Sequence, residues 1–250
     1  MADYLLLRGW AREQRHWGGF PKRLQEEIGG SGRVICLDHP GFGTEFSRLS
    51  PFSLEEIVED LRYRWRQLKP SENSYVIGIS LGGMIALQWA KQFPKDWRGT
   101  VVINSSIAGY SKPWERLFMK NLKKLRQALF EKDAVKRERL VLEMTTRLSP
   151  DKIAELSETW AAYSGEFPAL KRNILAQLWA ASRFRLGAPP PVDTLVLASR
   201  QDGLVNPKCS ETLSVKTGFP IQWHPEAGHD LTLEDPAWAS RSIVSWSNSL

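Results

Sequence analysis

The chain has 250 residues, of which 42% are hydrophobic and 25% charged. This balance is typical of one large soluble α/β domain with a sizeable core. No apolar run approaches the roughly 20 residues that cross a bilayer, and the N-terminus shows no signal-peptide pattern, so we expect no membrane span. The two cysteines, Cys36 and Cys209, lack metal-ligand spacing and favour a reducing compartment, so we expect a cytoplasmic protein.

The net charge of +6 is concentrated in one stretch. Residues 111–148 hold 11 Lys and Arg against 5 Asp and Glu, a difference of +6 that equals the whole-chain value. Two interpretations remain open for this stretch: a solvated helix face, or a docking face for an acidic protein partner. No nucleic-acid motif accompanies the charge, so we expect no nucleic-acid partner.

The first half of the chain alternates short apolar runs with helical patterns. The runs predict strands at 4–7, 34–37, 75–77 and 101–103. Helical spacing is found over 17–28, 54–68 and 81–93, and Ser53 with Glu56 forms a capping-box pattern before the second of these. Alternating elements of these lengths predict a mainly parallel sheet with helices on both faces.

The pattern changes at Ile107 and resumes after Leu186. Between these residues there are about four helical patterns and no strand, and one pattern begins at Ser149-Pro150, a cap followed by a first-turn proline. Trp160 and Trp179 stand at apolar positions in this stretch and are predicted to be core. Strands resume at 195–197 and 221–223. We therefore predict a core domain of residues 1–106 and 187–250, with a helical cap of residues 107–186 inserted.

The third predicted strand ends in Gly78-Ile79-Ser80-Leu81-Gly82-Gly83, and a helix follows at once. This is G-x-S-x-G between a strand and a helix, where a tight turn presents the serine hydroxyl above the sheet edge. The crowded turn requires small residues two positions before and two after the serine, and the helix N-terminus favours negative charge nearby. Ser80 is therefore the predicted nucleophile.

A serine nucleophile needs a base, and the base needs a carboxylate that orients it. Of the four histidines, His229 lies in a loop after the last apolar run, at the same sheet edge as Ser80. Asp202 follows the strand at 195–197, which gives the order Ser80, Asp202, His229 that α/β-hydrolases use. Asp230 is discounted as the acid because a neighbour of the histidine rarely reaches its Nδ1. Asn104 ends an earlier strand but is not a carboxylate.

These pieces resemble the α/β-hydrolase superfamily, in particular its serine carboxylesterases and enol-lactonases with a helical cap. The resemblance covers nearly the whole chain, through "RGW", "LDHPGFG", "GISLGGMIALQWA", "LVLASRQDGLV" and "AGHDLTLEDP". Relative to the family, the chain begins at what is usually the third strand, so we expect about six parallel strands. The predicted cap matches the family's cap domain in position. Cap sequences diverge most, so the identity of the substrate does not transfer.

The resemblance implies a serine hydrolase that cleaves a carboxylic ester of a small or medium acyl group through an acyl-enzyme. The backbone N–H groups of Trp10 and Leu81 would stabilise the oxyanion, and no metal or cofactor is expected. Alternatives are a hydrolase of acyl-carrier-bound esters docked by the basic cap, a serine-dependent lyase or acyltransferase, and a non-catalytic ligand-binding member of the fold.

Arg8 departs from the family pattern, because most members have His-Gly where this chain has Arg8-Gly9. Gly9 keeps the backbone free to turn the Trp10 N–H toward the oxyanion. Arg8 itself is expected to hold the neighbouring loop through carbonyls or a carboxylate such as Asp38, or else to face the pocket and favour an anionic substrate. His39 and Trp114 are further candidates to line the pocket.

Overall fold

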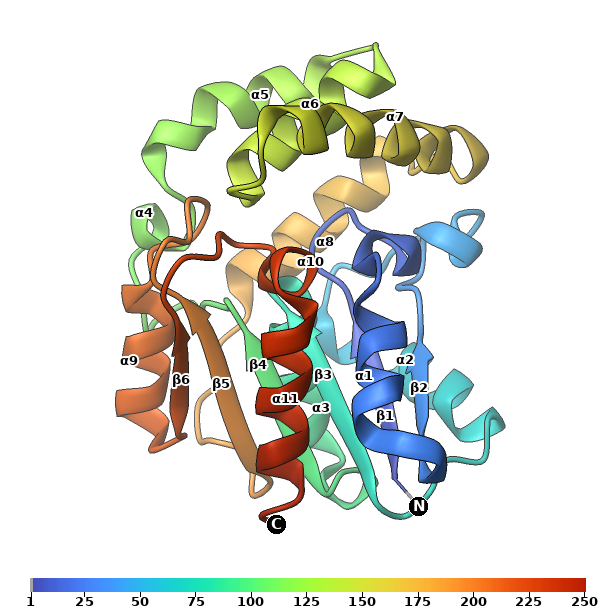
Figure 1. Cartoon of the computed structure of the whole chain (residues 1–250), viewed down its shortest axis with the longest axis vertical. Helices are drawn as coiled ribbons and strands as arrows, with labels where there is room; N and C mark the ends of the chain where they lie inside the picture. The colour runs from blue at the N-terminus through green and yellow to red at the C-terminus, as the bar shows by residue number, and fades with distance from the viewer. Residues whose placement is uncertain (1) are drawn as a thin grey trace.

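The computed structural model describes residues 2–250 and contains one sheet of six parallel strands, as predicted (Figure 1). The strands lie in the order β2-β1-β3-β4-β5-β6. Their bounds are β1 Asp3–Leu7, β2 Arg33–Cys36, β3 Ser74–Ile79, β4 Gly99–Ile103, β5 Asp193–Ser199 and β6 Ile221–His224. The alternating sequence pattern predicted such a parallel sheet, and the six strands agree with the number that the resemblance to α/β-hydrolases implies.

Alternate strand residues supply two separate hydrophobic layers. Leu5 and Val76 pack into the layer with α2 (Leu54–Gln67), α3 (Leu81–Gln92) and α9 (Lys208–Thr217). Tyr4 and Ile77 pack into the opposite layer with α1 (Phe20–Ile28) and α11 (Pro236–Ser247). Figure 1 shows α1 and α11 side by side on the near face of the sheet. Both faces are covered, which is why the central strands are apolar without alternation.

Local signals set several helix ends as expected. Ser53 accepts a hydrogen bond from the Glu56 N–H at the start of α2, and α3 ends before Pro94. The helix predicted from residue 17 begins later. Gly18, with φ +57°, separates a short 3₁₀ turn, η1 (Gln14–Trp17), from α1. The other short elements are η2 Gly29–Ser31, η3 Gly43–Glu45, η4 Pro94–Asp96 and α10 Leu231–Glu234.

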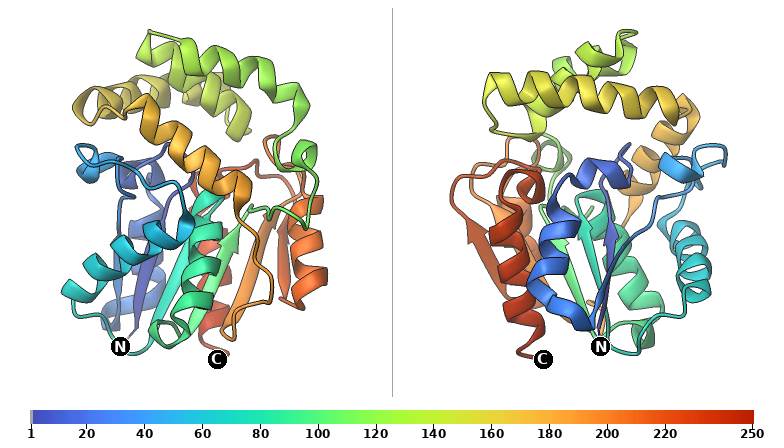
Figure 2. Two further views of the ribbon diagram at one scale, coloured as in Figure 1. Left: turned by 180° about the vertical axis from the view of Figure 1, so that it is seen from behind. Right: turned by 45° about the vertical axis from the view of Figure 1, so that its right-hand side comes forward.

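The segment between β4 and β5 is helical and lies over the carboxyl ends of the strands (Figure 2). It comprises α4 Pro113–Arg116, η5 Met119–Asn121, α5 Leu122–Phe130, α6 Ala134–Thr145, α7 Pro150–Glu166 and α8 Lys171–Arg183. Ser149 and Pro150 begin α7 as predicted, and Trp160 is buried with Leu142. The domain boundaries at 106 and 187 stay a prediction.

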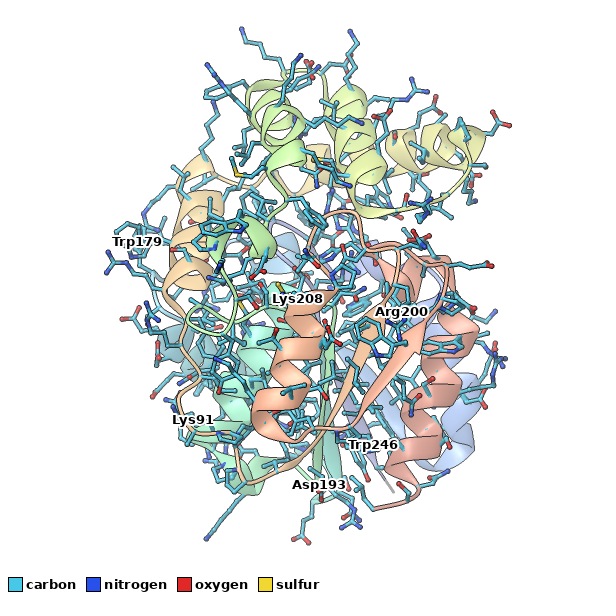
Figure 3. The ribbon with its side chains drawn as sticks, turned by 90° about the vertical axis from the view of Figure 1, so that its left-hand side faces the viewer. Lys91, Trp179, Asp193, Arg200, Lys208 and Trp246 are labelled. Atoms are coloured by element: carbon cyan, nitrogen blue, oxygen red, sulfur yellow. The ribbon has the colours of Figure 1, made fainter. Side chains whose placement is uncertain are left out.

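The prediction of Trp179 as core is wrong. Its side chain is 48% exposed on the outer side of α8 (Figure 3), where the Arg183 guanidinium lies 3.9 Å from its ring centroid. Helical spacing alone does not show whether an apolar stripe has a neighbour to cover it.

The direction in which the strands follow one another reverses between β1 and β3. From β1 the chain moves outward to β2, returns to β3, and then continues in the opposite direction. Open parallel sheets bind ligands at such a reversal, outside the carboxyl ends of the strands. The loop after β1 and the serine turn after β3 both lie there. Across residues 2–250, none of the helices combines the length and the apolar character needed to cross a bilayer.

Candidate active site

Ser80 stands on a strained turn between β3 and α3. Its backbone has φ +56° and ψ −114°, which is unfavourable for a residue with a side chain. The Ser80 N–H donates to the carbonyl of Ile103 at 2.8 Å, and the Ser105 hydroxyl donates to the Ser80 carbonyl at 2.7 Å. These bonds fix the turn to the end of β4.

Space requires two glycines around Ser80, and a third glycine lies close to it. A Cβ on Gly78 would overlap the backbone of Gly82, and a Cβ on Gly82 would overlap the carbonyls of Leu7 and Arg8. A Cβ on Gly9 would lie 3.3 Å from the Ser80 Cβ and 4.0 Å from its Oγ. The loop after β1 therefore passes directly beside the serine, where a side chain in place of Gly9 would be tightly packed.

His229 and Asp202 meet at the same edge of the sheet. The His229 Nδ1 lies 2.8 Å from Asp202 Oδ2, and both side chains are buried. The other oxygen, Asp202 Oδ1, accepts from the N–H groups of Leu204 and Val205, both at 2.9 Å, so the carboxylate has a fixed orientation. Burial lowers the pKa of His229, but the charge and hydrogen bond of Asp202 outweigh it, and the net result is a raised pKa.

The candidate oxyanion donors flank Ser80. Leu81 is the first residue of α3, so its N–H has no acceptor inside the helix. Among residues 2–250, no hydrogen bond uses the Trp10 backbone N–H, and none joins the Ser80 hydroxyl to His229. Catalytic hydrogen bonds often form only when a substrate is bound. The roles of Trp10 and Leu81 therefore stay predictions.

Asn104 has a structural task that the sequence did not indicate. It ends β4 with φ +44°, and its Oδ1 accepts from the Ser199 N–H at 2.8 Å. Its amide nitrogen donates to the His229 carbonyl at 2.8 Å. One side chain thus joins the ends of β4 and β5 to the histidine loop. The sequence shows that Asn104 follows a strand and is not a carboxylate, but its hydrogen-bond partners depend on the tertiary structure.

Arg8 pairs with Asp230 and not with the suggested Asp38. The guanidinium donates twice to the carboxylate, from Nη1 at 3.0 Å and from Nη2 at 2.7 Å, and it lies 4.8 Å from the Trp17 ring centroid. Burial would raise the pKa of Asp230, but the charge and hydrogen bonds of Arg8 hold it below its usual range. The pair connects the loop after β1 to the residue that follows His229.

The other candidate residues from the sequence are Asp38, His39 and Trp114. Asp38 accepts hydrogen bonds from Gln14 and Thr44 and so organises the loop after β2. His39 is buried beneath α8, while Trp114 is 55% exposed on α4. The prediction that His39 and Trp114 line a pocket stays untested.

Replacing Arg8 by methionine is expected to lower the free energy of unfolding by about 3–5 kcal/mol, because Asp230 would remain buried without its cation. Urea denaturation measures this change. The double variant Arg8→Met/Asp230→Leu should recover most of the loss, because it leaves no unpaired charge. Unchanged stability together with lost preference for anionic esters would instead place the guanidinium in the pocket.

The six-stranded parallel sheet and the strained serine between β3 and α3 define an α/β-hydrolase. A family model described as "Alpha/beta hydrolase family" matches residues 4–241, and the chain belongs to this family.

Known relatives are distant in sequence. The biotin biosynthesis bifunctional protein BioHC of Teredinibacter turnerae is 30% identical over 120 residues, covering 44% of this chain and 20% of that protein. A pimeloyl-acyl-carrier-protein methyl ester esterase of Yersinia enterocolitica is 32% identical over 106 residues, covering 42% and 36%. The esterase EaEST of Exiguobacterium antarcticum superposes with a TM-score of 0.79 at 18% identity, covering 99% of this chain and 92% of that one. The likeness to EaEST shows the fold alone. The chain matches well under half the length of each of the two sequence relatives.

Proposed function

We propose that this protein is a serine esterase that cleaves a carboxylic ester of a small or medium acyl group. The observation that carries the proposal is the His229–Asp202 pair at 2.8 Å, at the sheet edge where the strained Ser80 stands. The methyl ester esterase among its sequence relatives supports the same class of reaction.

The reaction divides into acylation and deacylation. The Ser80 Oγ forms a bond to the ester carbonyl carbon while its proton passes to His229 Nε2, and the carbonyl electrons move onto the oxygen. The N–H groups of Leu81 and Trp10 stabilise this oxyanion. The tetrahedral centre then expels the alkoxide, which takes the proton from His229. A water molecule repeats the same steps on the acyl-enzyme and releases the acid.

Asp202 supports both half-reactions without itself accepting a proton. Its carboxylate keeps the proton of neutral His229 on Nδ1, which leaves Nε2 free to act as base. It also stabilises the imidazolium that forms in each half-reaction, in agreement with the raised pKa of His229.

The test is a series of p-nitrophenyl esters with acyl chains of increasing length, combined with a fluorophosphonate probe. We expect turnover of the shorter esters and labelling on the peptide that contains Ser80, located by mass spectrometry. Labelling of another serine, or neither labelling nor turnover, would contradict the proposal.

A second candidate substrate, an ester carried on an acidic acyl-carrier protein, is favoured by the charge of the insert. Seven cations on and beside α5 and α6 are exposed: Lys120, Lys123, Lys124, Arg126, Lys132, Lys136 and Arg139. We call this set the basic patch. Within residues 2–250, Lys123 and Arg126 have no carboxylate partner within ion-pair distance, and exposed Met119 and Phe130 lie beside the patch in the chain. Basic charge at this density attracts an acidic partner and accelerates its association.

For this candidate, we expect Lys123→Glu/Arg126→Glu to lower kcat/KM on a carrier-bound ester about tenfold or more at low salt, and to leave p-nitrophenyl ester turnover unchanged. Lys22→Glu/Lys95→Glu is the matched control, because both lysines are exposed and lie outside the insert. The wild-type kcat/KM on the carrier ester should also fall as salt is added. Equal losses in the two double variants, or no dependence on salt, would exclude docking by the basic patch.

A further inference from the structure

Helix α8 buries two amide side chains where an amphipathic helix normally buries apolar ones. Asn173 and Gln177 are one turn apart, and both are fully buried. A buried amide costs free energy unless its donors and acceptor are bonded, so the partners of these side chains explain their presence.

Gln177 connects two loops at the carboxyl edge of the sheet. Its Oε1 accepts from the Ala11 backbone N–H at 3.0 Å, and its Nε2 lies 3.3 Å from His39 Nδ1. Burial lowers the pKa of His39 to about 3, so the ring is neutral and its Nδ1 can accept this hydrogen bond. The Gln177 amide therefore has a partner at both ends.

The loop that Gln177 holds is the one beside Ser80. Ala11 has φ +55°, a conformation that costs an alanine about 1 kcal/mol or more and that must be stabilised by its surroundings. The preceding Trp10 donates from its ring Nε1 to the Ile174 carbonyl of α8 at 2.8 Å. Helix α8 thus restrains the loop through the Trp10 ring and through the next backbone amide. The Trp10 N–H itself is left free, next to the Gly9 that approaches Ser80.

We propose that Gln177 is a positioning residue for the oxyanion hole: by holding the Ala11 amide, it keeps the Trp10 N–H directed at the carbonyl that Ser80 attacks. The proposal rests on the serine-esterase function. An oxyanion donor stabilises the transition state from about 2.7–3.1 Å, and a misplacement of about 1 Å can cost about 100-fold in rate, so a loop that can relax loses much of its effect. Gln177 lies on the helical insert, so the insert contributes directly to the geometry of the reaction and does more than cover the site.

Asn173 provides a matched control in the same helix. Its Oδ1 accepts from the Ser50 N–H at 2.9 Å, and its Nδ2 donates to the carbonyls of Arg48 at 3.0 Å and Gly41 at 3.3 Å. It has the burial of Gln177 and more hydrogen bonds, but it restrains the loop after β2. If Gln177 had a purely structural role, removing its amide and removing the Asn173 amide should change stability and kcat to a similar extent.

The experiment compares Gln177→Met, which keeps length but removes both hydrogen bonds, with Asn173→Leu, which keeps shape. Both variants should lose stability in urea denaturation. We expect Gln177→Met to lower kcat on a p-nitrophenyl ester about 10–100-fold with KM within about twofold, because only transition-state stabilisation is removed. Asn173→Leu should keep kcat within about threefold.

Gln177→Glu retains an acceptor for the Ala11 N–H and should recover most of the kcat lost in Gln177→Met. Equal losses of kcat in Gln177→Met and Asn173→Leu, or no recovery in Gln177→Glu, would overturn the proposal.

Failure of the esterase function itself is recognisable, because the wild type would then show neither turnover nor labelling of Ser80. Hydrogen exchange of the peptide covering residues 8–13 would still decide whether Gln177 restrains the loop. At least tenfold faster exchange in Gln177→Met, with no change in Asn173→Leu, supports the restraint. Equal exchange in the two variants overturns it.

Discussion

The Ser80→Ala variant is expected to lower kcat for a p-nitrophenyl ester by about 10⁴–10⁶-fold, with little change in KM. Alanine removes the only atom that bonds to the acyl group, so no acyl-enzyme can form. The remaining turnover reflects substrate bound beside the oxyanion donors and attacked directly by water. Initial rates over a range of substrate concentrations measure both constants.

The fold should survive this change, because the Ser80 hydroxyl takes no part in the hydrogen bonds that fix the turn. Those bonds use the Ser80 backbone N–H and carbonyl, and alanine retains both. The control is Ser240→Ala in α11, a fully buried serine whose hydroxyl has no hydrogen-bond partner within residues 2–250. Ser240→Ala should keep wild-type kinetics. Equal activity in Ser80→Ala and wild type would remove Ser80 from the reaction.

Asp202→Asn is expected to lower kcat/KM by about 10³–10⁴-fold and to move its pH dependence. The Asn oxygen can still accept from Leu204 and Val205, so the new NH₂ group faces His229 Nδ1 and donates to it. The proton of the imidazole then resides on Nε2, which can no longer accept the proton of Ser80.

The direction of the pH shift follows from the cause of the raised pKa. Only neutral His229 acts as base, so wild-type activity is lost as the pH falls through a pKa above 6.5. Without the Asp202 charge, burial dominates and lowers the pKa, so the acid limb of the variant should move to lower pH. Profiles of kcat/KM from pH 5 to 9 measure this movement.

A second Asp–His contact supplies the control for Asp202→Asn. Asp235 Oδ2 lies 3.3 Å from His224 Nε2, outside the candidate site. Asp235→Asn should leave both the rate and the pH profile unchanged. If Asp202→Asn kept activity within tenfold, or if its acid limb did not move, Asp202 would not be the group that orients His229.

Local sequence predicted much of the site because its requirements are local. A nucleophile on a strand-to-helix turn needs Gly78 and Gly82 within two residues of Ser80, and backbone overlap enforces this in the structure. Ser149-Pro150 likewise contains its own signal for the start of α7. Short apolar runs predicted the strands of the sheet, because a strand that is buried on both faces is continuously apolar.

Apart from Asp202 with His229, side-chain partners far apart in the chain could not be predicted. Arg8 pairs with a carboxylate 222 positions away, and no feature of the sequence separates Asp230 from Asp38 as its partner. Trp179 lies on an apolar helical stripe, yet its side chain is half exposed and its ring contacts the Arg183 guanidinium. No sequence signal marks Gln177, because its partners Ala11 and His39 lie far away in the chain and meet it only in the fold.

The sequence by itself determined the six parallel strands, the helical insert and the serine turn, because these depend on periodicity and on sterics within a few residues. The sequence predicted Asp202 as the partner of His229, and the two side chains are in contact. Only the tertiary structure decided the other contacts near the carboxyl edge: Arg8 with Asp230, Asn104 with the histidine loop, and Gln177 with the loop beside Ser80. Each of these contacts joins segments that the sheet brings together. A buried hydrogen bond or ion pair stabilises the protein only when the fold places both partners within bonding distance.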